Sequence, residues 1–154
     1  GASAPGGGIF GGGVNRRILR ASGRRAGFAT GGRSGRTALD DGSLALDMAM
    51  PGSGKTGANP EQLFAMGYAA CFDNALPVAA KQLGLAPTAT RTSVEVGIGQ
   101  TAAGGYALDV DLHVEVHGLD QSAARKLVEA THQVCPYSNA TRGNIEVRLH
   151  VSVA

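Results

Sequence analysis

The two cysteines of this chain are the residues best suited to chemistry, because a thiolate is a strong nucleophile that needs little activation. Cys71 lies within a long apolar segment, and Cys135 ends a second segment with helical periodicity. One interpretation is that both are small, buried hydrophobic side chains. The alternative is a redox pair, in which one thiolate attacks an oxidant and the other cysteine resolves the oxidised product.

Two other uses of the thiols have less support. A zinc site needs four ligands in a recognisable spacing. His132 lies one helical turn before Cys135, but the sequence places no second pair of ligands near Cys71. A structural disulfide is uncommon in the cytosol. A redox or nucleophilic pair therefore remains as the chemical alternative to simple burial.

A reactive thiolate needs a cation near its sulfur and a second group that holds this cation in place. Arg33, Arg36 and Glu61 are the candidates, because each lies in or beside a predicted turn that could fold over the helix of Cys71. The sequence alone leaves open which of these residues serve the thiol.

A helix that begins near Asn59 must position Cys71. Asn59 can cap the first free N–H groups, Pro60 suits the first helical position, and Glu61 complements the helix dipole. The segment 61–76 is apolar on nearly every side, which is typical of a buried helix. Pro77 predicts a bend or an end at that position.

Alternating apolar residues predict four strands, and a second helix is expected from Gln121 to Val134, capped by Asp120 and ended by Pro136. The strands cluster instead of alternating regularly with helices, so the predicted class is α+β with antiparallel sheet. The apolar helix then covers one face of a sheet. The four expected strands lie at residues 44–48, 94–98, 106–116 and 145–153.

The first part of the chain differs in composition from the rest. Residues 1–39 contain seven arginines and no acidic residue, whereas residues 40–154 contain seven basic and twelve acidic residues. We interpret residues 1–25 as a flexible Gly/Arg-rich leader and residues 26–154 as a single domain. The acidic balance of the domain argues against a nucleic-acid partner. The sequence contains no run of about 18 apolar residues, so no membrane span is predicted. It also shows no export signal, so we expect a cytoplasmic protein.

Three segments resemble the organic hydroperoxide resistance proteins of the OsmC-like superfamily. They are ATGGRSGR (29–36), NPEQLFAMGYAACF (59–72) and HQVCPYSNATRGNIEVRL (132–149). The resemblance covers residues 29–154. It implies an OsmC-like fold, with antiparallel sheets packed around two central helices, and an intertwined homodimer with its sites at the interface. The stretch SGRRAGFATGG (22–32) departs from the family's regular first strand, because paired arginines and glycines are poor strand formers.

The resemblance also implies an activity and its residues. A thiol peroxidase of this family reduces organic hydroperoxides, fatty-acid hydroperoxides included, to alcohols. Cys71 matches the peroxidatic position and Cys135 the resolving one, while Arg33 activates the thiolate and Glu61 orients Arg33. A dihydrolipoyl group on a lipoylated carrier protein serves as reductant, with no bound cofactor or metal. The alternative function is a non-enzymatic thiol redox sensor or binding module on the same fold.

Overall fold

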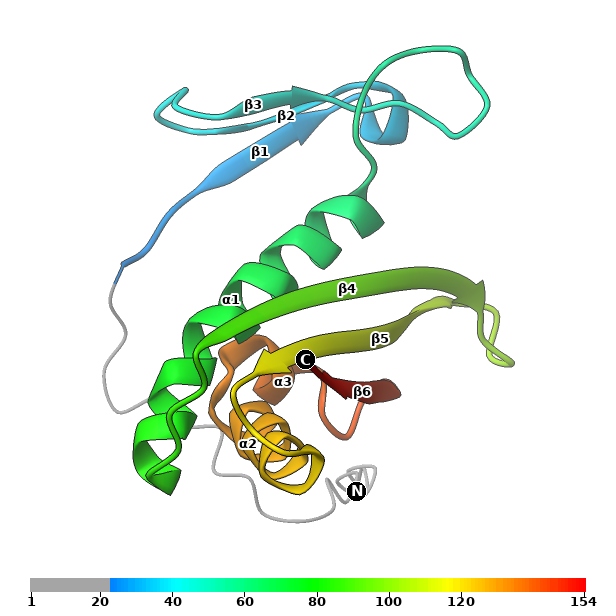
Figure 1. The fold of residues 1–154 in the computed structure, drawn as a ribbon. Coiled ribbons are helices and arrows are strands. Elements are labelled where there is room, and N and C mark those ends of the chain that lie inside the picture. Colours follow the sequence, from blue (N-terminus) through cyan, green and yellow to red (C-terminus); the bar gives the residue numbers. More distant parts are fainter. Residues whose placement is uncertain (1–22) are drawn as a thin grey trace, which may run out of the picture.

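Two separate sheets and a long helix organise residues 23–154, the part of the chain that this computed structural model describes (Figure 1). The predicted leader, residues 1–25, therefore lies almost wholly outside the described residues. Helices and strands together form an α+β fold, as the sequence predicts. The division into a leader and a single domain stays a prediction.

The first sheet lies at one end of the long helix and consists of three short antiparallel strands. These strands are β1 (Gly27–Thr30), β2 (Arg36–Leu39) and β3 (Ala45–Asp47). The strand expected at 44–48 is confirmed as β3. The Arg- and Gly-rich residues before Gly27 stay outside β1, so the poor strand formers shorten the first strand without preventing the sheet.

Helix α1 (Pro60–Leu83) begins where the sequence predicts. The side chain of Asn59 accepts a hydrogen bond from Gln62 N at 2.8 Å, and the side chain of Gln62 accepts one from Asn59 N at 3.0 Å. This reciprocal capping box satisfies N–H groups that have no partner within the helix. The first turn of α1, which carries Glu61, is therefore held firmly.

Pro77 does not end α1, which continues through it to Leu83. Proline removes one backbone hydrogen bond, but Ala79 and Ala80 beyond it are buried in the core, and this packing stabilises the last turns. The expectation of a helix buried on all sides holds for one face only. Met66 is 68% exposed and Val78 is 45% exposed, which leaves an apolar stripe uncovered.

Within the described residues, α1 is long enough and apolar enough to cross a bilayer. Core helices of globular proteins meet the same two criteria. In this fold Tyr68 and Phe72 of α1 are completely buried against the rest of the core. Length and composition therefore do not distinguish the two cases, and the absence of a membrane partner stays a prediction.

The second sheet contains β4 (Ala89–Gln100), β5 (Tyr106–His117) and β6 (Val147–Val153). Strands β4 and β5 pair as an antiparallel hairpin, which agrees with the predicted antiparallel sheet. Strand β6, in contrast, pairs with β5 in parallel, which corrects the expectation of purely antiparallel sheets. Parallel neighbours need a crossover connection, and the helices between β5 and β6 provide it.

The crossover consists of α2 (Gln121–Val134) and α3 (Pro136–Thr141). The bounds of α2 and its cap are confirmed, since the Asp120 side chain accepts a hydrogen bond from Ala123 N at 2.8 Å. Pro136 ends α2 but also begins α3, which the sequence analysis did not anticipate. Helices α1 and α2 cover one face of the second sheet. The largest fully buried side chains of this core include Tyr68, Phe72, Leu76, Val110, Leu112, Val114, Val116, Leu127 and Val128.

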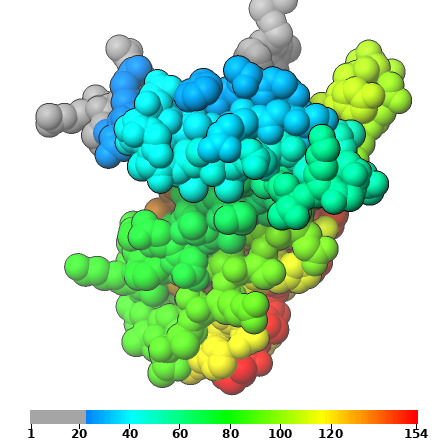
Figure 2. All heavy atoms as spheres, turned by 90° about the horizontal axis from the view of Figure 1, so that it is seen from above, coloured from blue at the N-terminus to red at the C-terminus, as the bar shows by residue number. Residues whose placement is uncertain are grey.

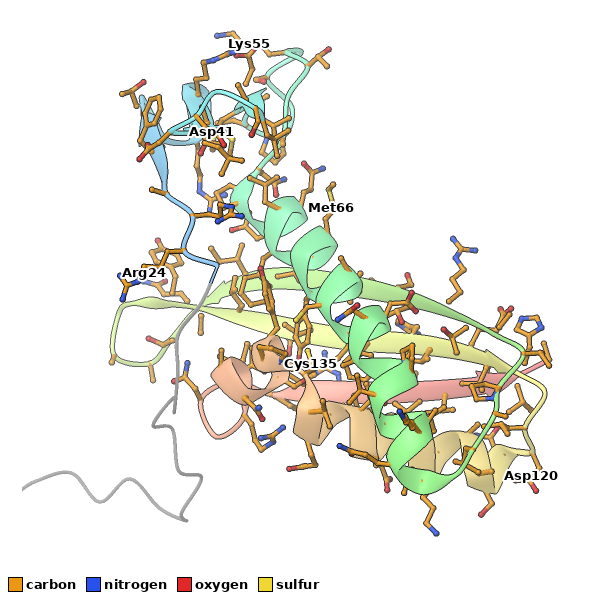
Figure 3. All side chains as sticks on the ribbon, turned by 90° about the vertical axis from the view of Figure 1, so that its left-hand side faces the viewer. Arg24, Asp41, Lys55, Met66, Asp120 and Cys135 are labelled. Carbon is orange, nitrogen blue, oxygen red and sulfur yellow. The ribbon has the colours of Figure 1, made fainter. Side chains whose placement is uncertain are left out.

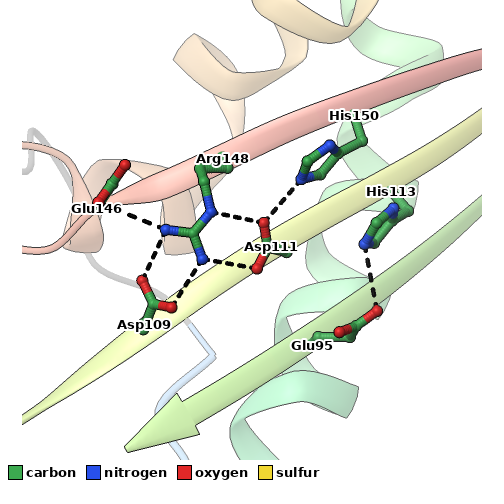
Figure 4. A network of polar contacts seen from close by, with 7 residues as sticks. All are labelled: Glu95, Asp109, Asp111, His113, Glu146, Arg148 and His150. Carbon is green, nitrogen blue, oxygen red and sulfur yellow. Dashed lines mark hydrogen bonds and ion pairs between the residues drawn. The ribbon is translucent and has the colours of Figure 1, made fainter. Parts of the chain in front are cut away.

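The opposite face of the second sheet is polar and carries an ion-pair network centred on Arg148 (Figure 4). The Arg148 guanidinium donates to both carboxylate oxygens of Asp109 at 2.9 and 2.7 Å and to those of Asp111 at 2.8 and 2.7 Å. His150 also contacts Asp111 at 2.7 Å. Arg148 holds the pKa of both aspartates below the ordinary value for this side chain.

This network predicts a pH-dependent effect of Arg148→Met. The folded state lowers the pKa of Asp109 and Asp111. Their ion pairs with Arg148 therefore stabilise the protein fully at pH values above the ordinary aspartate pKa of about 3.9. The stabilisation is lost as the pH falls through the lower folded-state values. We therefore expect Arg148→Met to lower the free energy of unfolding at pH 7 and to lower it progressively less below about pH 4. Urea titrations across this range measure the difference. An equal loss at every pH would assign the effect to packing of the arginine stem.

Candidate active site

Cys71, on α1, and Cys135, between α2 and α3, lie next to each other, and Figure 3 shows Cys135 beside α1. Cys135 Sγ lies 3.6 Å from Cys71 Sγ, and both cysteines are in the free thiol form. Cys135 is completely buried, whereas Cys71 is partly accessible to solvent. An oxidant in solution therefore reaches Cys71 first, and Cys135 is placed to react with the product.

Burial raises the pKa of the Cys71 thiol above its ordinary value, and the neighbouring Cys135 raises it further. The backbone N–H of Tyr137, in the first turn of α3, donates a hydrogen bond to Cys71 and partly offsets this rise. Since the thiolate is the reactive form, these groups of one chain leave Cys71 mostly protonated at neutral pH. Efficient reaction requires an additional positive charge.

Arg33 lies in the tight turn Gly32–Ser34, between β1 and β2. Gly31 and Gly32 have φ values of 74° and 56°, a left-handed conformation that glycine adopts without steric cost. A Cβ atom on Gly35 would lie 1.8 Å from the carbonyl oxygen of Thr30, so a side chain is excluded there. These glycines allow the turn to present Arg33 toward the start of α1.

Arg33 forms a bidentate ion pair with Glu61, as the sequence analysis anticipates. Arg33 Nη1 donates to Glu61 Oε2 at 2.8 Å, and Nη2 donates to Oε1 at 2.5 Å. Arg33 lowers the pKa of Glu61, and Glu61 raises the pKa of Arg33, so both side chains are charged at neutral pH. The Glu61 side chain is 13% exposed and that of Arg33 is 40% exposed, which leaves the guanidinium accessible to another group.

Within one chain, the Arg33–Glu61 pair does not lie at Cys71. Glu61 and Cys71 are ten residues apart on α1, which corresponds to a rise of about 15 Å along the helix. Arg33 is not among the groups that shift the pKa of Cys71. The other candidate cation, Arg36, is paired with Asp47 at 2.8 Å on an exposed part of the first sheet. One chain thus holds a thiol pair and an ion pair at separate places on α1.

Comparison with known proteins identifies the family. The family model for OsmC-like proteins matches residues 52–150. An organic hydroperoxide resistance protein of Xanthomonas axonopodis pv. citri is 48% identical over 126 residues, which cover 79% of this chain and 88% of the relative. The chain belongs to the organic hydroperoxide resistance family of OsmC-like proteins. The resemblance noted from the three sequence segments is therefore confirmed.

Other members of the organic hydroperoxide resistance family agree in sequence and in structure. The protein OhrB of Bacillus subtilis is 44% identical over 126 residues, covering 80% of this chain and 93% of the relative. The crystal structure of an organic hydroperoxide resistance protein from Legionella pneumophila matches this fold with a TM-score of 0.81 and 44% sequence identity. The match covers 87% of this chain and 100% of that chain. The predicted OsmC-like fold is thereby confirmed. The names of these relatives support a role in organic hydroperoxide resistance and a peroxidase-type enzyme.

The residues around the thiols of this family member include some that the sequence analysis did not assign to the site. Tyr68, three residues before Cys71 on α1, hydrogen-bonds Ser138 at 2.8 Å. Ser138 also contacts His132 at 2.7 Å. The helical spacing of Tyr68 and Cys71 was a usable signal, but the position of Ser138 depended on α3, which was not expected.

Metal ligation has no visible candidate in the described part of the chain. Residues 23–154 contain no group of three or more His, Cys, Asp or Glu side chains arranged to hold a metal ion. His132, the nearest potential ligand to Cys135 in sequence, instead uses Nδ1 to contact Ser138.

Proposed function

We propose that this protein is a thiol peroxidase that reduces organic hydroperoxides to alcohols. The observation that carries the proposal is the pair of free thiols 3.6 Å apart, one partly accessible and one buried, in a chain of the organic hydroperoxide resistance family. Ala70, beside Cys71 on α1, is an exposed apolar residue, which suits a substrate with an alkyl chain.

The reaction we propose has three steps. The Cys71 thiolate attacks the distal oxygen of the hydroperoxide, the O–O bond breaks, and the alkoxide takes up a proton and leaves as the alcohol. Cys71 is then a sulfenic acid. Cys135 attacks this sulfur and displaces hydroxide, which leaves as water with the Cys135 proton, and a Cys71–Cys135 disulfide forms. A dithiol finally reduces the disulfide by two thiol–disulfide exchanges.

The proposed reductant is a dihydrolipoyl group on a lipoylated carrier protein, as the family resemblance implies. A dithiol suits the task, because its second thiol releases the mixed disulfide formed by its first. The chemistry of these steps uses sulfur alone, so the proposal includes no bound cofactor or metal. The cytoplasmic location of the protein and the lack of a nucleic-acid partner stay predictions.

We also propose that the working unit is a homodimer in which Arg33 and Glu61 of one copy lie beside Cys71 of the other. Two observations support this arrangement. The Arg33–Glu61 pair is distant from Cys71 along α1 of its own chain. Apolar side chains are exposed on α1 at Met66 and on the β4–β5 hairpin at Ile98 and Tyr106, and the tip of that hairpin projects from the body (Figure 2).

An assay with tert-butyl hydroperoxide, dihydrolipoamide and lipoamide dehydrogenase tests the proposed function through the loss of NADH. We expect sustained turnover, and faster turnover with tert-butyl hydroperoxide than with hydrogen peroxide. A generic peroxidase of the wider superfamily would show similar rates with both oxidants. Oxidation that stops after one equivalent, without turnover under any dithiol, would instead support a thiol sensor. Light scattering of the same preparation measures whether the protein is a dimer.

A further inference from the structure

A buried chain of hydrogen bonds connects the helix of Cys71 to the turn of Cys135. Ser138 Oγ lies 2.8 Å from Tyr68 OH and 2.7 Å from His132 Nδ1. Tyr68 OH also lies 3.2 Å from Thr141 Oγ1. Tyr68 and Ser138 are completely buried, so each lost hydrogen bond would leave a polar group without water to replace its partner. Such a chain holds its members in a defined geometry.

The members of this chain flank both cysteines. His132, near the end of α2, and Ser138, in α3, lie three residues before and three residues after Cys135. Their hydrogen bond closes the turn that carries Cys135. Tyr68 lies three residues before Cys71, which is about one turn of α1. The Tyr68–Ser138 hydrogen bond therefore joins the two segments that hold the thiols.

The charge state of these groups suits a fixed connection. Burial lowers the pKa of His132, and the nearby Arg142 lowers it further. Burial raises the pKa of Tyr68, although its hydrogen bonds to Ser138 and Thr141 oppose the rise. Both side chains are therefore neutral at physiological pH, and moderate changes of pH leave the hydrogen bonds in place.

We propose that Tyr68, Ser138 and His132 are positioning residues for disulfide formation, an inference that rests on the proposed peroxidase function. In this step Cys135 forms a bond to the sulfur of oxidised Cys71, the sulfur–oxygen bond breaks, and water leaves. A second hydroperoxide competes for the same sulfenic acid and converts it into a sulfinic acid, releasing another alcohol. Holding Cys135 at 3.6 Å favours the first reaction, because an intramolecular partner has a high effective concentration.

The test compares the fates of oxidised Cys71 in Tyr68→Phe, Ser138→Ala and wild type. Each variant removes one hydroxyl and keeps most of the side-chain volume. We expect the first oxidation of Cys71 to proceed at the wild-type rate. The ratio of sulfinic acid to disulfide, measured by mass spectrometry after excess tert-butyl hydroperoxide, should rise by up to about tenfold, the factor that corresponds to one lost hydrogen bond. Ser138→Thr keeps the hydroxyl and should restore the wild-type ratio.

Thr131→Val is the matched control for these variants. Thr131 is completely buried on α2, and its hydroxyl donates to Leu127 O at 2.7 Å, outside the chain that reaches Tyr68. Loss of this buried hydroxyl should leave the product ratio at the wild-type value. A rise as large as that of Tyr68→Phe would show that any weakening of the fold has the same effect, and the positioning role would be wrong.

A second measurement needs no peroxide. The equilibrium between glutathione and the Cys71–Cys135 disulfide, measured in glutathione redox buffers, gives the effective concentration of one cysteine thiol at the other. We expect this concentration to fall by up to about tenfold in Tyr68→Phe and Ser138→Ala. An unchanged or higher value would overturn the positioning role. If wild-type Cys71 failed to react with hydroperoxide, the proposed peroxidase function would be wrong, while the redox-buffer values would still decide the role of the three residues.

Discussion

Cys71→Ser abolishes peroxide turnover, with an expected loss of roughly 10⁴-fold or more, the scale seen when an enzyme loses its nucleophile. Serine keeps the shape of the side chain, but its hydroxyl stays protonated at neutral pH and cannot be oxidised in the same way. Cys71 is the partly accessible member of the thiol pair, so buried Cys135 cannot take over its role. The coupled NADH assay measures turnover, and mass spectrometry measures the oxidation state of the remaining cysteine.

Cys135→Ser separates the two roles of the thiols. Cys71 should still react with the first equivalent of hydroperoxide, because Cys71 faces the oxidant. The sulfenic acid should then progress to a sulfinic acid at high peroxide, since no neighbouring thiol is present to resolve it. If Cys135→Ser lost the first oxidation while Cys71→Ser retained it, the assignment of the two roles would have to be reversed.

Arg33→Ala should lower the rate of Cys71 oxidation by about 10²- to 10³-fold at neutral pH, the usual effect of removing a charge that stabilises the reacting group. Burial and Cys135 raise the pKa of Cys71 within one chain. Without the guanidinium, only a small fraction of Cys71 is thiolate at pH 7. As long as the pH is below the pKa of Cys71, this fraction increases about tenfold with each unit of rising pH. The rate of Arg33→Ala should therefore increase steeply with pH, while that of wild type levels off earlier.

A mixed dimer tests whether Arg33 acts on the other copy. In the proposed homodimers, Arg33→Ala should be about 10²- to 10³-fold slower than wild type at neutral pH, and Cys71→Ser should be inactive. A heterodimer, isolated with two affinity tags after co-expression, combines the intact Arg33 of one copy with the intact Cys71 of the other. If each site is shared between copies, one of its two sites works, and we expect about half of the wild-type activity. An inactive heterodimer would place both residues in the same chain's site.

Sequence patterns predicted helices and strands correctly where interactions between residues close in sequence determine the local structure. The bounds of α2 and its Asp120 cap, and the start of α1 at the Asn59 capping box, follow from side chains that satisfy nearby backbone N–H groups. The parallel β5–β6 pair was missed, because alternation shows which face of a strand is apolar and says nothing about the direction of its neighbour. Helix α1 passes Pro77 because tertiary burial outweighs one lost hydrogen bond.

The candidate site could be predicted in part. The family resemblance identified both cysteines, and their Sγ–Sγ distance of 3.6 Å agrees with a reactive pair. The Arg33–Glu61 ion pair also follows from the resemblance. The separation of this pair from Cys71 within the chain was not drawn from the sequence, although the predicted helix contains both Glu61 and Cys71, ten residues apart, which corresponds to about 15 Å. Phe72, which follows Cys71 in the sequence, is completely buried in the core and does not line a pocket at the thiol.

The parallel pairing of β6 with β5 has a consequence for the synthesis of the protein. A chain that leaves the ribosome from its N-terminus can form the β4–β5 hairpin early, because its partners are adjacent in sequence. The other edge of β5 stays without a partner until β6, at residues 147–153, has been released. Unpaired strand edges favour association with other chains. Until β6 has been released, the second sheet of the nascent protein is incomplete, and aggregation through the open edge of β5 competes with folding in this interval.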